Sequence, residues 1–90
     1  MYSIILSNKA KEDITKLKRN EPVAFKKLNK LLLELMEHPL TGTGQIEQLR
    51  HCDSYTYSRR ISKKHRLIYR IHEEFVEVLI LSSYGHYDDK

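Results

Sequence analysis

The chain has 90 residues, of which 40% are hydrophobic and 31% are charged, and its formal net charge is +4. This length fits one domain spanning residues 1–90, and the balance is typical of a globular protein rather than a disordered one. No apolar run approaches the roughly 20 residues that a membrane-spanning helix needs. The N-terminus lacks the features of a signal peptide, and the single cysteine, Cys52, excludes an internal disulfide. We therefore expect a cytoplasmic protein without a membrane partner.

The first half of the chain predicts a strand followed by two helices. Residues 1–6 are mostly apolar and end at Ser7 or Asn8, either of which can cap a helix over residues 9–19. A second helix over residues 22–37 begins with proline, and its apolar residues recur at helical spacing. The short break between the helices predicts an antiparallel helical hairpin that covers a sheet. The many lysines of these helices form either a solvated face or a contact for nucleic acid.

The second half of the chain predicts four strands. The loop over residues 38–44 contains two glycines, but it lacks the spacing of a phosphate-binding loop. The expected strands cover residues 45–50, 55–61, 66–71 and 75–81, and the last of these is apolar enough to lie centrally in the sheet. The order of elements predicts an α+β fold: an N-terminal strand and an antiparallel two-helix hairpin packed on a twisted, mainly antiparallel sheet.

Positive charge peaks in the middle of the chain. Residues 1–45 carry a net charge of +3, residues 46–70 carry +5 and residues 71–90 carry −4. Such a concentration predicts a polyanionic partner, although a solvated basic surface explains it equally well. Within this region, Arg60 and Arg66 lie on adjacent predicted strands, where a guanidinium is a fixed fork for phosphate oxygens.

Two further residues could supply acid–base chemistry. Glu47 is an isolated carboxylate close to these arginines, which would keep it ionised as a base or hold it in a structural ion pair. His86 lies in the C-terminal tail, where an imidazole could donate a proton near neutral pH or could simply be exposed. Tyr57 and Tyr87 could stack on bases or be rim aromatics of a small sheet.

These groups match the requirements of RNA cleavage without a metal. The 2′-hydroxyl that attacks phosphorus needs a base, the crowded phosphorane needs cations, and the 5′-oxygen leaving group needs an acid. The histidines show no metal-ligand spacing, so we expect no metal and no other cofactor. The remaining ones are interpreted as ordinary surface residues: His38, His51, His65 and His72.

The pattern of these residues resembles the YoeB/Txe branch of the RelE-like toxins of bacterial toxin–antitoxin modules over nearly the whole chain. The motifs are His38-Pro39, then Gly42-x-Gly44-x-x-Glu47-x-Leu49-Arg50, then Tyr57-Ser58-Arg59-Arg60-Ile61-x-x-x-His65-Arg66-Leu67-Ile68-Tyr69, and finally His86-Tyr87. The resemblance implies a RelE-like, microbial-ribonuclease-like fold. It also implies a metal-independent, ribosome-dependent mRNA endoribonuclease that inhibits translation.

The resemblance also implies a role for each matching residue. Glu47 would be the general base, His86 the general acid and Arg66 the group that stabilises the transition state, with Tyr87 supporting the tail of the site. The implied substrate contacts are Arg50, Tyr57, Arg59 and Arg60.

The implied partners are a cognate antitoxin protein, the ribosome and mRNA, with operator DNA bound only through the antitoxin complex; a homodimer is left open. Two alternatives compete with this function. The chain could be a ParE-like toxin that binds DNA gyrase without catalysis, although a binder needs neither Glu47 nor His86. It could also be an inactive partner that binds only antitoxin and operator.

Overall fold

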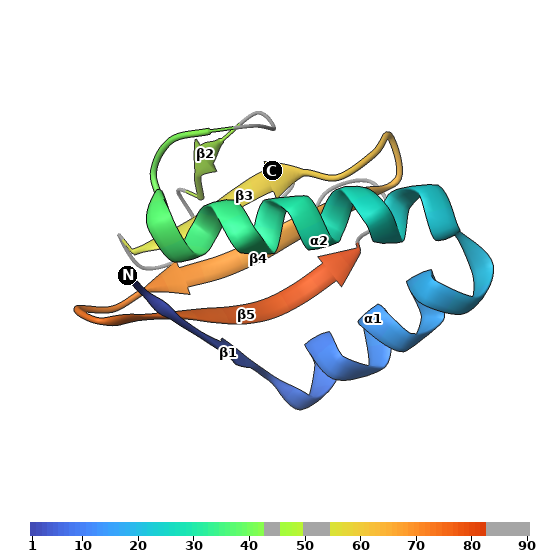
Figure 1. Ribbon diagram of the computed structural model, residues 1–90, viewed down its shortest axis with the longest axis horizontal. Coiled ribbons are helices and arrows are strands. Elements are labelled where there is room, and N and C mark those ends of the chain that lie inside the picture. Colours follow the sequence, from blue (N-terminus) through green and yellow to red (C-terminus); the bar gives the residue numbers. More distant parts are fainter. Residues whose placement is uncertain (43–45, 50–54, 83–90) are drawn as a thin grey trace.

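The computed structural model describes residues 1–42, 46–49 and 55–82, the last three by their backbone only. Within these ranges the elements follow in the order β1 (Ser3–Leu6), α1 (Asn8–Asn20), α2 (Pro22–Glu37), β2 (Glu47–Gln48), β3 (Thr56–Arg60), β4 (His65–Ile71) and β5 (Phe75–Ser82). This order and the layering of helices on a sheet in Figure 1 confirm the predicted α+β class. No helix in the described ranges has the length and apolar character required to cross a membrane.

The strands form one sheet in the order β1-β5-β4-β3-β2. β1 runs parallel to β5, and every other neighbouring pair is antiparallel, as expected for a mainly antiparallel sheet. The middle position belongs to β4, while the apolar β5 lies between β4 and β1. The basic hairpin of β3 and β4 therefore occupies the centre of the sheet and extends toward the edge formed by β2.

The two helices begin where the sequence predicts. The Ser7 hydroxyl accepts a hydrogen bond of 3.0 Å from the Ala10 amide at the start of α1 and donates one of 2.8 Å to the Leu79 carbonyl of β5. This cap therefore also joins α1 to the sheet. Pro22 opens α2, which runs back across one face of the sheet in the direction opposite to α1 (Figure 1).

The hydrophobic core lies between α2 and one face of the sheet. Leu28, Leu31 and Leu35 of α2 are fully buried, and α1 adds Leu17. The sheet contributes, among others, Leu67, Tyr69, Val76 and Val78. Since side chains alternate along a strand, the neighbours of Leu67 and Tyr69 in β4 project to the other face, which neither α1 nor α2 covers, although Ile68 is fully buried there. That open face carries the candidate site.

Candidate active site

The strand register gathers a carboxylate and two arginines on the open face. Glu47 of β2 pairs with Ser58 of β3, and Arg60 of β3 pairs with Arg66 of β4. Because directly paired residues share a face and residues two apart along a strand do as well, all four project to the same side. Two segments that are separated in the sequence therefore deliver the predicted base and the predicted phosphate contacts to one surface.

Glu47 and Arg66 form an ion pair on this surface. The Glu47 Oε1 and Arg66 Nη1 atoms are 3.5 Å apart, and the side chain of Glu47 is 65% exposed whereas that of Arg66 is only 15% exposed. An exposed pair of this length holds its partners weakly, contributing roughly 0–1 kcal/mol to stability. The carboxylate is consequently close to a guanidinium but still open to a substrate hydroxyl.

Arg60 distinguishes this pair from an ordinary ion pair. Further along the same face, Arg70 and Glu77 approach within 3.7 Å, so contact between an arginine and a carboxylate is not diagnostic by itself. Near Glu47, however, two arginines are paired directly across adjacent strands. Like charges in that arrangement repel unless an anion lies between them.

The arginines also offer hydrogen-bond donors. Arg60 Nε and Arg66 Nη1 are buried atoms that have no hydrogen-bond partner among the described residues. The hydroxyl of Ser58, which pairs with Glu47, is buried in the same way. Ser58 was not among the predicted site residues, and only the alternation along β3 could have indicated it. Two guanidinium groups on paired positions beside a carboxylate suit a phosphodiester, whose oxygens accept hydrogen bonds and carry negative charge.

Two of the predicted substrate contacts lie elsewhere. Arg59 is 0% exposed, and its guanidinium is held between the sheet and the chain that follows α2. Tyr57 projects to the helix-covered face, where its ring stacks on that of Tyr69 with centroids 6.1 Å apart. The alternation of β3 directs these side chains away from Glu47 and Arg66, so the structure does not bring them together with the other predicted site residues.

The prediction for His65 requires a correction. It was expected at the surface, but it begins β4, is 9% exposed, and has its Nε2 atom 2.8 Å from Glu21 Oε2. This hydrogen bond lowers the pKa of the Glu21 carboxyl below its ordinary value. Glu21 connects the two helices, so the pair joins the helical layer to the turn before Arg66.

Three predicted site residues lie outside the described residues: Arg50, His86 and Tyr87. Their roles remain predictions. Among the residues that the structure does describe, no group of three His, Cys, Asp or Glu side chains could hold a metal ion.

Comparisons with known proteins agree with this fold. A family model described as the YoeB-like toxin of bacterial type II toxin–antitoxin systems matches residues 6–87. Toxin YoeB of Escherichia coli strain K12 is 31% identical over 84 residues, which cover 93% of this chain and 98% of that protein. Toxin YoeB of a Synechocystis species is 35% identical over 69 residues, 77% of this chain and 78% of its own.

Solved structures give the same result. The YoeB dimer from Staphylococcus aureus superposes with a TM-score of 0.85 at 31% identity, covering 96% of this chain and 98% of that one. A YoeB–YefM complex from the same organism gives a TM-score of 0.81 at 31% identity, with coverage of 97% and 99%. Since the family model spans most of the sequence and the curated relatives agree with it, this chain belongs to the YoeB-like toxin family of bacterial type II toxin–antitoxin systems.

Proposed function

We propose that this protein is a toxin that cleaves mRNA on the ribosome without a metal ion, and so inhibits translation. The observation that carries the proposal is the open face of the sheet, where Glu47 lies 3.5 Å from Arg66 and Arg60 is paired with Arg66. Membership of the toxin family supports a polyanionic substrate. The geometry supports a base that lies beside the cations that such a substrate needs.

The chemical step is a transesterification within the RNA. The Glu47 carboxylate takes the proton of a 2′-hydroxyl, and the 2′-oxygen forms a bond to the adjacent phosphorus. The bond from phosphorus to the 5′-oxygen breaks, and the leaving oxygen takes a proton from the His86 imidazolium. The products are a 2′,3′-cyclic phosphate and a 5′-hydroxyl.

Arg66 and Arg60 act on the phosphate during this step. Charge develops on the non-bridging oxygens of the phosphorane, and a guanidinium fixed on a central strand stabilises that charge without reorganisation. Arg66 is the better placed of the two for this role because it contacts the base. Arg60 binds and orients the phosphate, Arg50 contacts the RNA, and Tyr87 supports the tail that carries His86.

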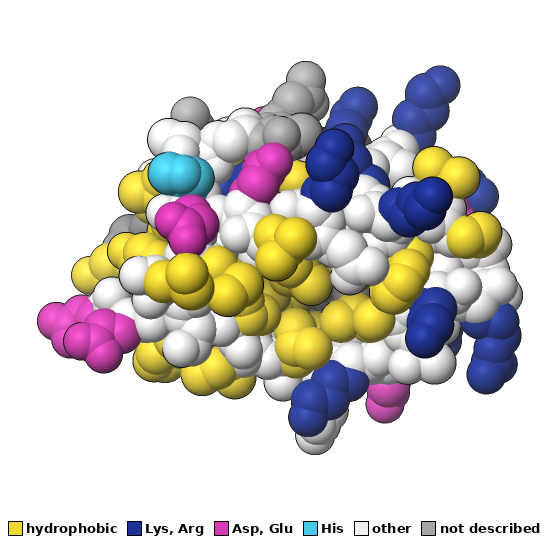
Figure 2. All heavy atoms as spheres, in the orientation of Figure 1, with side chains coloured by type: hydrophobic (Ala, Val, Ile, Leu, Met, Phe, Trp, Pro, Cys, Tyr) yellow, Lys and Arg dark blue, Asp and Glu magenta, His cyan; other side chains and the backbone are white. Residues whose placement is uncertain are grey.

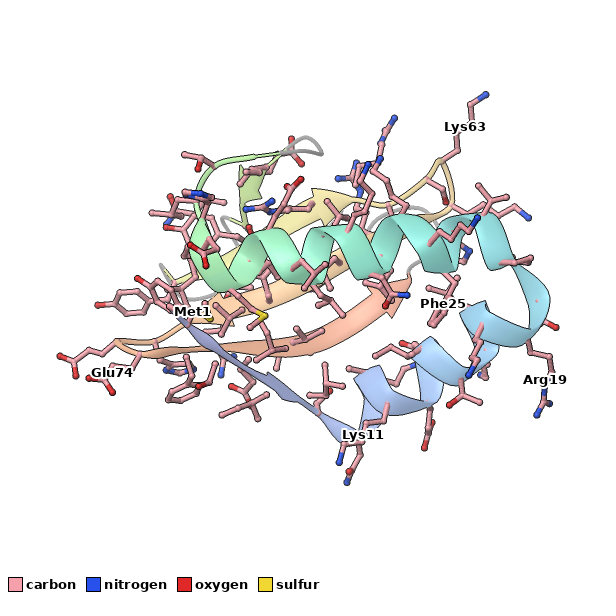
Figure 3. All side chains as sticks on the ribbon, in the orientation of Figure 1. Met1, Lys11, Arg19, Phe25, Lys63 and Glu74 are labelled. Atoms are coloured by element: carbon pink, nitrogen blue, oxygen red, sulfur yellow. The ribbon has the colours of Figure 1, made fainter. Side chains whose placement is uncertain are left out.

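The distribution of surface charge suits a large RNA partner. On the face that Figure 2 shows, lysine and arginine side chains lie over α1, α2 and the turn between β3 and β4, whereas most acidic side chains lie toward the opposite end and one lies beside α1. In Figure 3, Lys63 extends from the first of these ends and Glu74 from the other. Such a dipolar surface orients the protein as it approaches a polyanion.

A cognate antitoxin is the proposed protein partner. A relative from Staphylococcus aureus forms a complex with YefM and another structure shows it as a dimer. We propose an equivalent antitoxin complex for this chain in the cytoplasm, with operator DNA bound only through the antitoxin, and a homodimer as a further assembly.

Induced expression with and without antitoxin tests the proposal, combined with cleavage of mRNA on purified ribosomes. We expect growth arrest and cleavage by the unaltered protein, and loss of both in the Glu47→Ala and His86→Ala variants with the fold retained. If both variants stay fully toxic, this assignment is wrong. One structural relative is described as a YoeB/ParE toxin from Agrobacterium tumefaciens, at 25% identity and a TM-score of 0.85. A gyrase supercoiling assay on the same samples therefore tests the ParE-like alternative, which predicts inhibited supercoiling and intact mRNA.

A further inference from the structure

Arg59 holds the segment that follows α2. Its Nη2 atom donates hydrogen bonds of 2.6 Å to the carbonyl oxygens of both His38 and Thr41. Its Nη1 atom lies 3.1 Å from Glu34 Oε1, and its Nε atom donates to the Tyr69 hydroxyl over 3.2 Å. The network, which we call the Arg59 anchor, therefore consists of Arg59, Glu34, Tyr69 and the backbone of residues 38–41.

Tyr69 completes the anchor from the neighbouring strand. Its hydroxyl donates a hydrogen bond of 3.0 Å to the Pro39 carbonyl, and its ring lies 5.9 Å from the Arg59 guanidinium carbon. Burial raises the pKa of the Tyr69 hydroxyl, and the adjacent arginine opposes that rise only in part. Tyr69 is therefore a protonated donor at neutral pH, as the contact with a carbonyl oxygen requires.

Gly42 closes the anchor on its outer side. Its φ of +114° is a backbone conformation that residues with a side chain rarely adopt. A Cβ atom at this position would lie 2.6 Å from Glu34 Oε1 and 3.1 Å from Arg59 Nη1. The glycine thus lets the chain pass close over the ion pair on its way toward β2.

The anchored segment precedes the proposed base in the sequence. Glu47 follows Gly42 by five positions, and β2 consists only of Glu47–Gln48. A two-residue strand at the edge of a sheet is fixed by few hydrogen bonds; one more comes from the Leu49 amide, which donates to the Thr56 carbonyl over 2.9 Å. The position of the Glu47 carboxylate therefore depends on how the chain enters β2 as well as on the pairing itself.

We propose that Arg59 is a positioning residue for Glu47. It fixes the path of residues 38–42 against β3, the strand with which β2 pairs, and thereby holds the carboxylate on the Arg66 side. A contribution to stability alone explains less well why a buried arginine is present at this position. A buried charge is costly, and apolar replacements often stabilise a protein equally well. This inference rests on the proposed function through the role of Glu47.

The sharpest test combines a double-mutant cycle with hydrogen exchange. Arg59→Met keeps the apolar stem and removes the donors, and its cleavage rate is measured in single turnover with Glu47 present and in the Glu47→Ala background. We expect a loss on the order of 10²-fold when Glu47 is present, comparable to misplacing a catalytic group by about 1 Å. No further loss is expected in the Glu47→Ala background, because a residue that acts through Glu47 cannot act without it.

Hydrogen exchange measures the positioning itself, without catalysis. We expect Arg59→Met to lower the protection of the Leu49 amide, while RNA affinity is unchanged because Arg60 and Arg66 remain. Leu17→Ala, a core change in α1, is the matched control; it lowers global stability but leaves the cleavage rate of the folded protein and the relative protection of Leu49 unchanged. If Arg59→Met does not fold, Tyr69→Phe and Glu34→Gln carry the same cycle, with smaller effects in the same direction.

The inference is overturned if the loss of rate is equally large in the Glu47→Ala background, or if the Leu49 amide keeps its protection. Absence of mRNA cleavage by the unaltered protein would instead remove the proposed function. In that case the exchange experiment still decides whether the Arg59 anchor holds β2.

Discussion

Arg59 and Arg60 are neighbours in β3, yet they lie in opposite environments. Arg59 projects toward the helices, is 0% exposed and has its donors engaged by Glu34, Tyr69 and backbone carbonyls. Arg60 projects to the open face beside Arg66, with a buried Nε that has no hydrogen-bond partner among the described residues. The alternation of a strand thus places one of two identical side chains in a buried network and the other where we propose that it binds an anion.

From the difference between Arg59 and Arg60, we expect substitutions on the open face to lower the cleavage rate most strongly. Arg66→Ala removes the guanidinium beside the base, and we expect the single-turnover cleavage rate to fall about 10²–10³-fold, as for loss of one preorganised donor. The lost ion pair should contribute no more than about 1 kcal/mol to the free energy of unfolding because Glu47 is 65% exposed, and truncation of the largely buried Arg66 stem adds a loss of packing. A large loss of stability with an unchanged rate would assign Arg66 to the scaffold instead.

The helix-covered face should control stability. Arg59→Ala removes the donors that Arg59 supplies to Glu34 and to the carbonyls of His38 and Thr41, and we expect a cost of about 3 kcal/mol. That figure is the lower end of the range for broken buried pairs, because the Glu34 side chain is 29% exposed. Arg60→Ala is the matched control in the same strand, with an expected change within about 0.5 kcal/mol. Urea unfolding measures the free energy of unfolding of both variants. Equal losses would contradict the distinction between Arg59 and Arg60.

Gly42→Ala tests the anchor from its outer side. The positive φ and the close approach to Glu34 predict a loss of roughly 1–3 kcal/mol in the free energy of unfolding. The same substitution should reduce cleavage, since the segment it displaces leads into β2. Thermal unfolding and single-turnover kinetics measure the two effects; full stability in the alanine variant would show that the chain passes the ion pair without needing a glycine.

The smallest expected effect concerns pH and the Glu21–His65 pair. The pKa of Glu21 is lowered in the folded protein by its hydrogen bond with His65. Its contribution to stability is therefore present above the ordinary carboxyl pKa and is lost as the pH falls through the lowered value. Glu21→Gln should reduce the pH dependence of stability in that acidic window. If the unaltered protein and Glu21→Gln show identical pH profiles of stability in urea unfolding, the Glu21–His65 pair does not contribute to stability.

Local patterns were sufficient for the elements and for the pairing of the basic strands. The proline that opens α2 and the helical spacing of its apolar residues predicted Pro22–Glu37 in full, and the hairpin of β3 and β4 was expected within one residue at each end. The expected strand over residues 45–50 is shorter, with β2 limited to Glu47–Gln48 among the described residues.

Long-range partners were beyond the reach of those patterns. The partners of Arg59 come from residues 34–41 and from Tyr69 on the neighbouring strand, and the partner of His65 is Glu21, 44 positions away. A shift of one residue in strand register would exchange the environments of Arg59 and Arg60, so nothing local identifies the buried one. The motif of His38-Pro39 and Gly42 was noted without a reason; the Arg59 anchor now supplies a structural one.

The central claim is that Glu47 removes the proton of a 2′-hydroxyl on the face it shares with Arg60 and Arg66. The most direct test is single-turnover cleavage of ribosome-bound mRNA by the unaltered protein and by Glu47→Gln, with analysis of the new RNA ends. We predict a 2′,3′-cyclic phosphate at the cut and a rate about 10²–10⁴-fold lower for Glu47→Gln. An unchanged rate in that variant, or a cut without the cyclic phosphate, would contradict the account.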